Sequence, residues 1–212
     1  MSMTEDEARY EQWMDDLYRE HKEQAIEEFT DERLKSFYVT HPLVAQLAVE
    51  TLAEARKLLE GQSTAAQVFA AIAVEVGLKV ALLKPVVHGL VHSESTAEII
   101  TDLTLRHTRF DFFHQLLSEI LLKHGGVNLE SYAREGASKG LWAEIQEVQK
   151  CRDRVVHRAE SATREQAERA IAIARVILED LFPAVVSHLG LHLHDGVRVC
   201  QDWRCGRPEL CR

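Results

Sequence analysis

The residues with the clearest chemical potential lie in one stretch of nine, residues 150–158, with the sequence KCRDRVVHR. The stretch holds four basic residues, one acidic residue and one histidine. A histidine can accept or donate a proton near neutral pH, and an arginine can bind two oxygens of a phosphate. Together they could cleave a phosphodiester without a metal, because the histidine transfers the proton and the arginine stabilises the developing charge. If a ribose 2′-hydroxyl is the internal nucleophile, the substrate is RNA.

The spacing within this stretch predicts how the side chains would be arranged on a helix. Asp153 and His157 are four residues apart and would share one face, where the carboxylate would orient the imidazole and favour its protonated form. Arg152 precedes His157 by five residues and would lie about 140° away around the axis. One helix would therefore form an incomplete site, whereas two copies meeting at a two-fold axis would gather two arginines and two histidines. Three further basic residues are candidates for substrate binding: Lys150, Arg154 and Arg158.

Hydrophobic periodicity predicts that these residues belong to an all-α, antiparallel helical bundle. Helices are expected at residues 43–60, from a capping box at Thr64–Gln67 to Pro85, at 109–123, at 141–157, and from a capping box at Thr163 to Pro183. The second of these is apolar nearly all round and should be central to the bundle. It carries Glu75 and Lys79 four residues apart, which could form an internal ion pair or support a functional cleft.

The distribution of charge separates the start of the chain from the rest. Residues 1–34 contain twelve acidic and four basic residues and carry a net −8 of the total −9, whereas residues 150–164 are locally +3. We therefore expect an acidic helical extension over residues 1–38, which either docks on the bundle or binds a partner, and a helical domain over residues 39–189. No signal peptide or membrane span is expected, which indicates a cytoplasmic protein.

The last segment, residues 190–212, has a different pattern. Residues 191–199 are typical of a β-hairpin, and a three-residue loop at 194–196 would put its apolar side chains on one face. The segment also holds two histidines and three cysteines that could bind zinc, unless the cysteines are simply unpaired thiols: His192, His194, Cys200, Cys205 and Cys211. Because no phosphate-binding loop, dinucleotide motif or familiar metal motif occurs, we expect neither a cofactor nor a metal at the catalytic site.

The pattern Arg152-Asp153-x-x-x-His157 resembles the Rx(4–6)H motif of the HEPN superfamily. Its setting is similar too, since a late helix is followed by a short loop and a capped final helix, and the resemblance covers about residues 39–189. It implies an all-α bundle that dimerises and cuts RNA without a metal, often in toxin–antitoxin or other defence systems. Arg152 and His157 would then be catalytic, with Asp153 as a supporting residue. The helix with Glu75-x-x-x-Lys79 looks like the second helix of such domains.

Two positions depart from the pattern of active HEPN members. Asp153 stands where asparagine is more usual, and Ala159 stands where one version of the motif has a tyrosine that a partner transferase modifies. The leading hypothesis is a homodimeric, metal-independent endoribonuclease, acting as a toxin or anti-phage defence effector with an antitoxin or another defence partner. The alternatives are a non-catalytic HEPN module that binds RNA or a protein, and a scaffold that acts through its acidic helix or its Cys/His tail. The motif could also be a salt-bridged surface turn.

Overall fold

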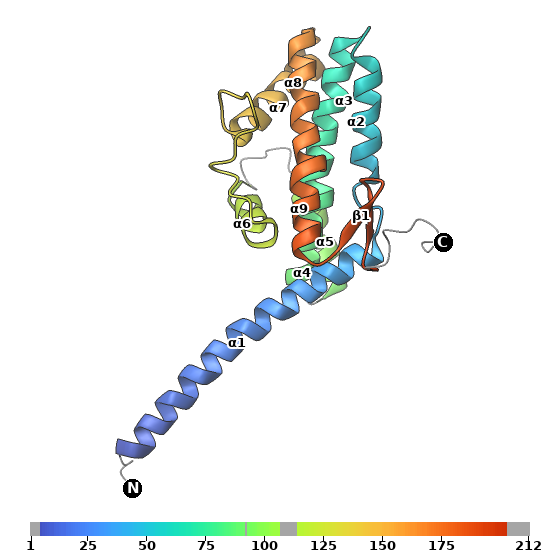
Figure 1. Cartoon of the computed structure of the whole chain (residues 1–212). Coiled ribbons are helices and arrows are strands. Elements are labelled where there is room, and N and C mark those ends of the chain that lie inside the picture. The colour runs from blue at the N-terminus through green and yellow to red at the C-terminus, as the bar shows by residue number, and fades with distance from the viewer. Residues whose placement is uncertain (1–4, 92, 107–113, 203–212) are drawn as a thin grey trace.

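A computed structural model describes residues 5–91, 93–106 and 114–202 of the chain (Figure 1). Most of these residues are helical, and the strands among them form one small two-stranded sheet, so the predicted all-α class is confirmed. The helices are α1 (Glu5–Thr40), α2 (Gln46–Leu58), α3 (Ser63–Val76), α4 (Lys84–Leu90), α5 (Glu94–Arg106), α6 (His114–Gly125), α7 (Leu141–Arg158), α8 (Arg164–Arg175) and α9 (Phe182–His188).

Two long helices lie side by side in the bundle and run in the same direction (Figure 1). One consists of α3, the π-helical segment η1 (Gly77–Leu83) and α4; the other consists of α8, the π-helical segment η3 (Val176–Leu181) and α9. Each begins as the second arm of a helical hairpin, in which α2 precedes α3 or α7 precedes α8. Near their starts the Ala162 N–H donates to Thr64 Oγ1 at 3.0 Å. Further along, a Cβ on Gly77 would lie 3.0 Å from Ile177 Cγ2, so this glycine permits the close approach.

The expectation that two helices end at Pro85 and Pro183 is wrong, because both helices continue to Leu90 and His188. A proline inside a helix lacks an N–H and clashes with the carbonyl four residues earlier. Here η1 and η3 directly precede the helical turns that contain the prolines, and their wider turns let the chain pass without a break. The carbonyl that Pro85 leaves without its α-helical donor is that of Ala81, and it accepts a hydrogen bond from the buried Tyr38 hydroxyl at 2.8 Å.

Helix α1 joins the bundle only through its last turns. Its side chains described before residue 30 are exposed, except for the half-buried Leu17, and this part of the helix projects away from the bundle (Figure 1). Leu34 and Tyr38, in contrast, are fully buried in the core. Arg33 Nη2 donates to the carbonyls of His88 and Val91, at 2.9 and 2.7 Å, where α4 ends. The last turns of α1 therefore pack as part of the bundle core.

The two expected capping boxes have different outcomes. The box at Thr163 is confirmed: Thr163 Oγ1 accepts from the Gln166 N–H, and Gln166 Oε1 accepts from the Thr163 N–H. The capping box expected at Thr64 does not form, because α3 already begins at Ser63 and the side chains of Thr64 and Gln67 therefore lie inside the helix. They bind other elements instead, since Gln67 Nε2 donates to the Val148 carbonyl at 3.1 Å. The expected helix at 109–123 corresponds to α6, and residues 107–113 lie outside the described part.

The predicted hairpin is confirmed, but its predicted register is wrong. Strands β1 (His192–His194) and β2 (Arg198–Cys200) are antiparallel, with Leu193 opposite Val199. The loop is therefore 195–197, and both Asp195 and Gly196 adopt positive φ values, 50° and 70°. Val199 is buried, and its N–H donates to the Pro42 carbonyl at 2.8 Å, which fixes β2 to the chain between α1 and α2.

Among the described helices, the continuous helix Ser63–Leu90 is long and apolar enough to cross a membrane. Its most apolar window has a mean hydropathy of 1.8, and 67% of that window is buried inside the structure. A helix that is apolar on most sides is expected at the centre of a bundle, which is where this one lies.

Candidate functional site

Six of the predicted site residues lie on α7, which confirms the helix expected at 141–157. The buried side chains of α7 recur every three or four residues and pack against α3 and α8. They are Leu141, Glu144, Ile145, Val148 and Cys151. Because this spacing turns one stripe inward, the charged residues of the last two turns occupy the flanks and the outer face of the helix.

The end of α7 is fixed by a tight connection to α8. Ala159 is left-handed, with φ 53°, and the carbonyl of Arg154 accepts the N–H groups of Ala159 and Glu160. The side chain of Arg154 also contacts this turn, since its Nε lies 3.2 Å from Glu160 Oε2. The connection then enters the capping box at Thr163 that opens α8. The last turn of α7 therefore presents His157 and Arg158 as exposed side chains at one end of the bundle.

Arg152 and Asp153 form an ion pair at the surface. Arg152 Nη1 lies 2.9 Å from Asp153 Oδ1, and the two side chains are 27% and 56% exposed. Asp153 shares the outer face of α7 with His157, as the four-residue spacing predicts, but the contact described for its carboxylate is with Arg152. A guanidinium has five N–H donors, so one such contact leaves donors of Arg152 for a ligand.

Lys150 and Arg154 lie on a different flank of α7, where they border a pocket of ≈ 290 Å³ between α3, α7 and α8. The polar residues that line the pocket are Gln67, Glu147, Lys150, Arg154, Gln166 and Arg169. The six predicted site residues on α7 are thus divided between this pocket and the adjoining surface that carries Arg152, Asp153, His157 and Arg158. The pocket is polar and partly basic, which suits an anionic or hydrogen-bonding ligand.

Four polar lining residues of this pocket were not predicted as site residues: Gln67 on α3, Glu147 on α7, and Gln166 and Arg169 on α8. Gln67 is fully buried, and while its Nε2 donates to Val148, its Oε1 has no partner in the described part of the chain. One sequence signal could have identified Gln67, because a glutamine in an otherwise apolar helix needs a polar neighbour. In the sequence, Gln166 is recognisable only as part of a capping box, and Arg169 looks like an ordinary surface residue.

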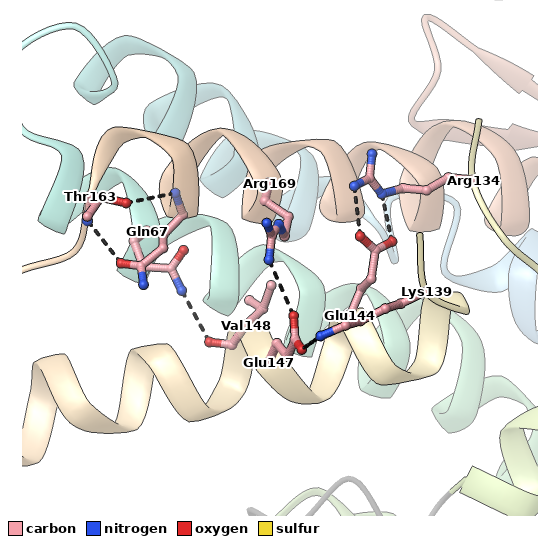
Figure 2. A network of polar contacts seen from close by, with 9 residues as sticks. Gln67, Arg134, Lys139, Glu144, Glu147, Val148, Thr163 and Arg169 are labelled. Atoms are coloured by element: carbon pink, nitrogen blue, oxygen red, sulfur yellow. Dashed lines mark hydrogen bonds and ion pairs between the residues drawn. The ribbon is translucent and has the colours of Figure 1, made fainter. Parts of the chain in front are cut away.

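A network of polar contacts borders this pocket (Figure 2). Glu147 pairs with Lys139 and, at 3.3 Å, with Arg169. The hydrogen bond from Lys139 lowers the pKa of Glu147 below its ordinary value, against an opposing effect of burial and with help from nearby basic residues. The buried Glu144 accepts two hydrogen bonds from Arg134, at 2.7 and 2.8 Å. These pairs hold α7 to α8 and to the preceding segment, and they balance part of the local positive charge.

Glu75 and Lys79, the predicted supporting residues, form an ion pair at 2.7 Å within their own long helix. The Lys79 side chain is nearly buried, whereas Glu75 is partly exposed. They lie eight and twelve residues beyond Gln67, which is about 12 and 18 Å along a helix at about 1.5 Å per residue. The structure therefore does not gather them with Arg152 and His157 around one cavity.

Three of the five tail residues considered for metal binding come together on the hairpin. One ligand atom from each of His192, His194 and Cys200 lies within 4.8 Å of the others. Cys205 and Cys211 lie outside the described residues. The group sits beside α9 and the end of α1, whereas the exposed end of α7 lies where α8 begins (Figure 1).

The arrangement at the end of α7 can transfer a proton through an exposed imidazole and bind phosphate through several guanidinium groups. Comparison of the chain with protein-family models, curated proteins and solved structures finds no match. The function must therefore be inferred from these residues and their geometry.

Proposed function

We propose that this protein is a homodimeric, metal-independent endoribonuclease of the HEPN type. The observation that carries the proposal is the position of Arg152 and His157 on the last two turns of α7, at an accessible end of an all-α bundle. The basic side chains of Lys150 and Arg154 beside them could hold the phosphates of a flexible RNA strand. The resemblance of the motif to the HEPN pattern supports the same reaction.

In the proposed reaction, the RNA 2′-oxygen attacks the adjacent phosphorus and the bond to the 5′-oxygen breaks. His157 accepts the proton of the 2′-hydroxyl, and His157 of the partner subunit donates a proton to the leaving 5′-oxygen. Arg152 binds the phosphate and stabilises the charge on its oxygens. The products are a 2′,3′-cyclic phosphate and a 5′-hydroxyl. Because Arg152 and His157 are about 140° apart around one helix, two copies of α7 are needed to surround the phosphate.

The same resemblance supports a role as a toxin or anti-phage defence effector that an antitoxin or another defence protein controls, and we propose that the protein acts in the cytoplasm. Its net charge of −9 disfavours indiscriminate coating of nucleic acid. The locally basic end of α7 would instead restrict RNA contact to one region.

The test is RNA cleavage by the full-length protein in EDTA, using a single-stranded RNA and analysis of the product ends. The unaltered protein should yield 2′,3′-cyclic phosphates, and His157→Ala should slow cleavage by about 10²–10⁴-fold, the usual contribution of a general acid or base. His21→Ala is a matched control, because His21 is an exposed helical histidine on the projecting part of α1. Unchanged cleavage by His157→Ala would remove this residue from catalysis.

A non-catalytic RNA-binding module is the second candidate, and the ion pair between Arg152 and Asp153 favours it. A carboxylate that holds the guanidinium would compete with a phosphate for the same donors and would repel it. Salt-dependent RNA binding that weakens in Arg154→Ala, with no cleavage in any buffer, would support this function over the nuclease.

A further inference from the structure

The C-terminal hairpin has two chemically different faces. Side chains alternate between the faces of a strand, so His192 and His194 share one face of β1 while Leu193 lies on the other. Cys200 is directly opposite His192, and the buried Val199 is opposite Leu193. The apolar face packs on the core. The opposite face therefore gathers two imidazoles and one thiol, which packing of the hairpin alone does not require.

Two further observations bear on what this face can bind. His192 Nε2 is buried and has no hydrogen-bond partner in the described part of the chain, although a buried ring nitrogen normally has one. The N–H of Asp202 donates to Cys200 Sγ at 3.4 Å. A hydrogen bond that orients a ligand side chain is typical of protein metal sites.

We propose that His192, His194 and Cys200 bind one zinc ion on the outer face of the hairpin. Imidazole and thiolate are the donors that zinc prefers, whereas calcium and magnesium require oxygen ligands. The three ligand atoms lie within 4.8 Å of one another. Zinc bonds of about 2.0–2.3 Å in a tetrahedron require about 3.3–3.8 Å between ligand atoms, so side-chain shifts of about 1 Å close the site. Cys200 releases its thiol proton to solvent as the Zn–S bond forms, and the fourth position is filled by water or a further donor.

The proposed ion has a structural role. Strands of three residues give a hairpin that is marginal by itself, yet this hairpin covers the core through Leu191 and Val199 and contacts Pro42 through a backbone hydrogen bond. A metal that joins β1 to β2 adds its binding free energy to folding at this end of the bundle. The inference is independent of the proposed nuclease, because the hairpin lies apart from Arg152 and His157.

Cobalt(II) is the probe, added to full-length protein that has no polyhistidine tag and has been stripped of metal by a chelator. We expect one cobalt per chain, visible ligand-field bands, a thiolate-to-cobalt charge-transfer band, and displacement of all these signals by zinc. Cys200→Ser should abolish the charge-transfer band, and His192→Ala or His194→Ala should weaken binding by more than about 10-fold. His188→Ala is the matched control, since this exposed histidine lies near the hairpin but outside the site.

Circular dichroism of each variant shows whether it has folded, and zinc should raise the unfolding temperature of the unaltered chain but not that of Cys200→Ser. A double variant, Cys205→Ser with Cys211→Ser, should retain the charge-transfer band, because Cys200 supplies the thiolate. Failure of the unaltered protein to bind cobalt stoichiometrically would overturn the proposal. So would a charge-transfer band that survives Cys200→Ser, because another cysteine would then hold the metal.

Discussion

At the scale of single residues, Asp153 has the greatest influence on which function the site can perform. Its carboxylate lies 2.9 Å from Arg152 Nη1 and on the same face of α7 as His157. It can orient both groups, but its negative charge opposes a phosphate. The proposed nuclease therefore requires that the remaining donors of Arg152 bind the phosphate despite this charge.

We expect Asp153→Asn to increase RNA cleavage about ten-fold, equivalent to about 1.4 kcal/mol of transition-state stabilisation. The amide keeps a hydrogen-bond acceptor for Arg152 but removes the charge that repels the phosphate. Initial rates on a single-stranded RNA measure the effect. Glu160→Gln is the matched control, since it neutralises the partner of Arg154 nearby and should change the rate less. A lower rate in Asp153→Asn would indicate that the carboxylate itself serves in the site.

The sequence predicted only the part of the site that one helix carries. Arg152, Asp153 and His157 could be placed because their spacing and the apolar stripe of α7 define the faces of a single helix. Gln67 and Arg169 could not, since they reach the same pocket from α3 and α8, and no periodicity relates helices that are distant along the chain. Which residues converge there depends on how these helices pack.

At the scale of elements, the helices were predicted better than their ends. Apolar periodicity identified the helices of the bundle, because a buried stripe imposes it over several turns. The signals at single positions were less reliable: Pro85 and Pro183 did not end their helices, and the Thr64 box did not form. At two of these positions, contacts with other helices outweighed the local sequence signal. The carbonyl of Ala81 obtained a donor from Tyr38, and Gln67 found the carbonyl of Val148.

The contact between α1 and η1 gives a testable stability prediction. Tyr38→Phe should lower the free energy of unfolding by about 1–3 kcal/mol, because it leaves the Ala81 carbonyl buried without the hydroxyl that donates to it. Urea denaturation at neutral pH measures the loss. Tyr18→Phe, a change at an exposed tyrosine on the same helix, should leave the stability unchanged. An equal stability of Tyr38→Phe and the unaltered protein would show that another group satisfies this carbonyl.

The difference in the free energy of unfolding between Tyr38→Phe and the unaltered protein should be smaller at alkaline pH. Burial raises the pKa of Tyr38 well above its ordinary value, so the folded chain keeps the proton where an unfolded chain loses it, near pH 10. The stabilisation by this hydroxyl is therefore complete below about pH 10 and declines as the pH rises further. Because phenylalanine cannot ionise, the gap between Tyr38→Phe and the unaltered protein should narrow above that pH.

At the scale of the whole molecule, the chain consists of a helical bundle and one projecting acidic helix (Figure 1). Residues 1–34 carry most of the net negative charge, yet the described side chains before residue 30 are almost all exposed. They include the large apolar residues Tyr10, Trp13, Met14 and Tyr18. Side chains that stay exposed bury little apolar surface and so contribute little to the stability of the fold. The bundle should therefore fold, dimerise and act without this part of α1.

Deletion of residues 1–28 tests this separation. We expect the shortened chain to unfold within about 2–4 °C of the full chain, a change of about 1 kcal/mol or less, because no buried side chain is described in the deleted part. Light scattering should still give the mass of a dimer, and RNA cleavage should persist, since both are proposed to depend on α7.

Deletion of residues 1–34 is the contrasting variant. It removes Arg33 from the carbonyls at the end of α4 and Leu34 from the core, and it should destabilise the bundle strongly. A monomer after the shorter deletion would instead place the dimer contact on the projecting helix.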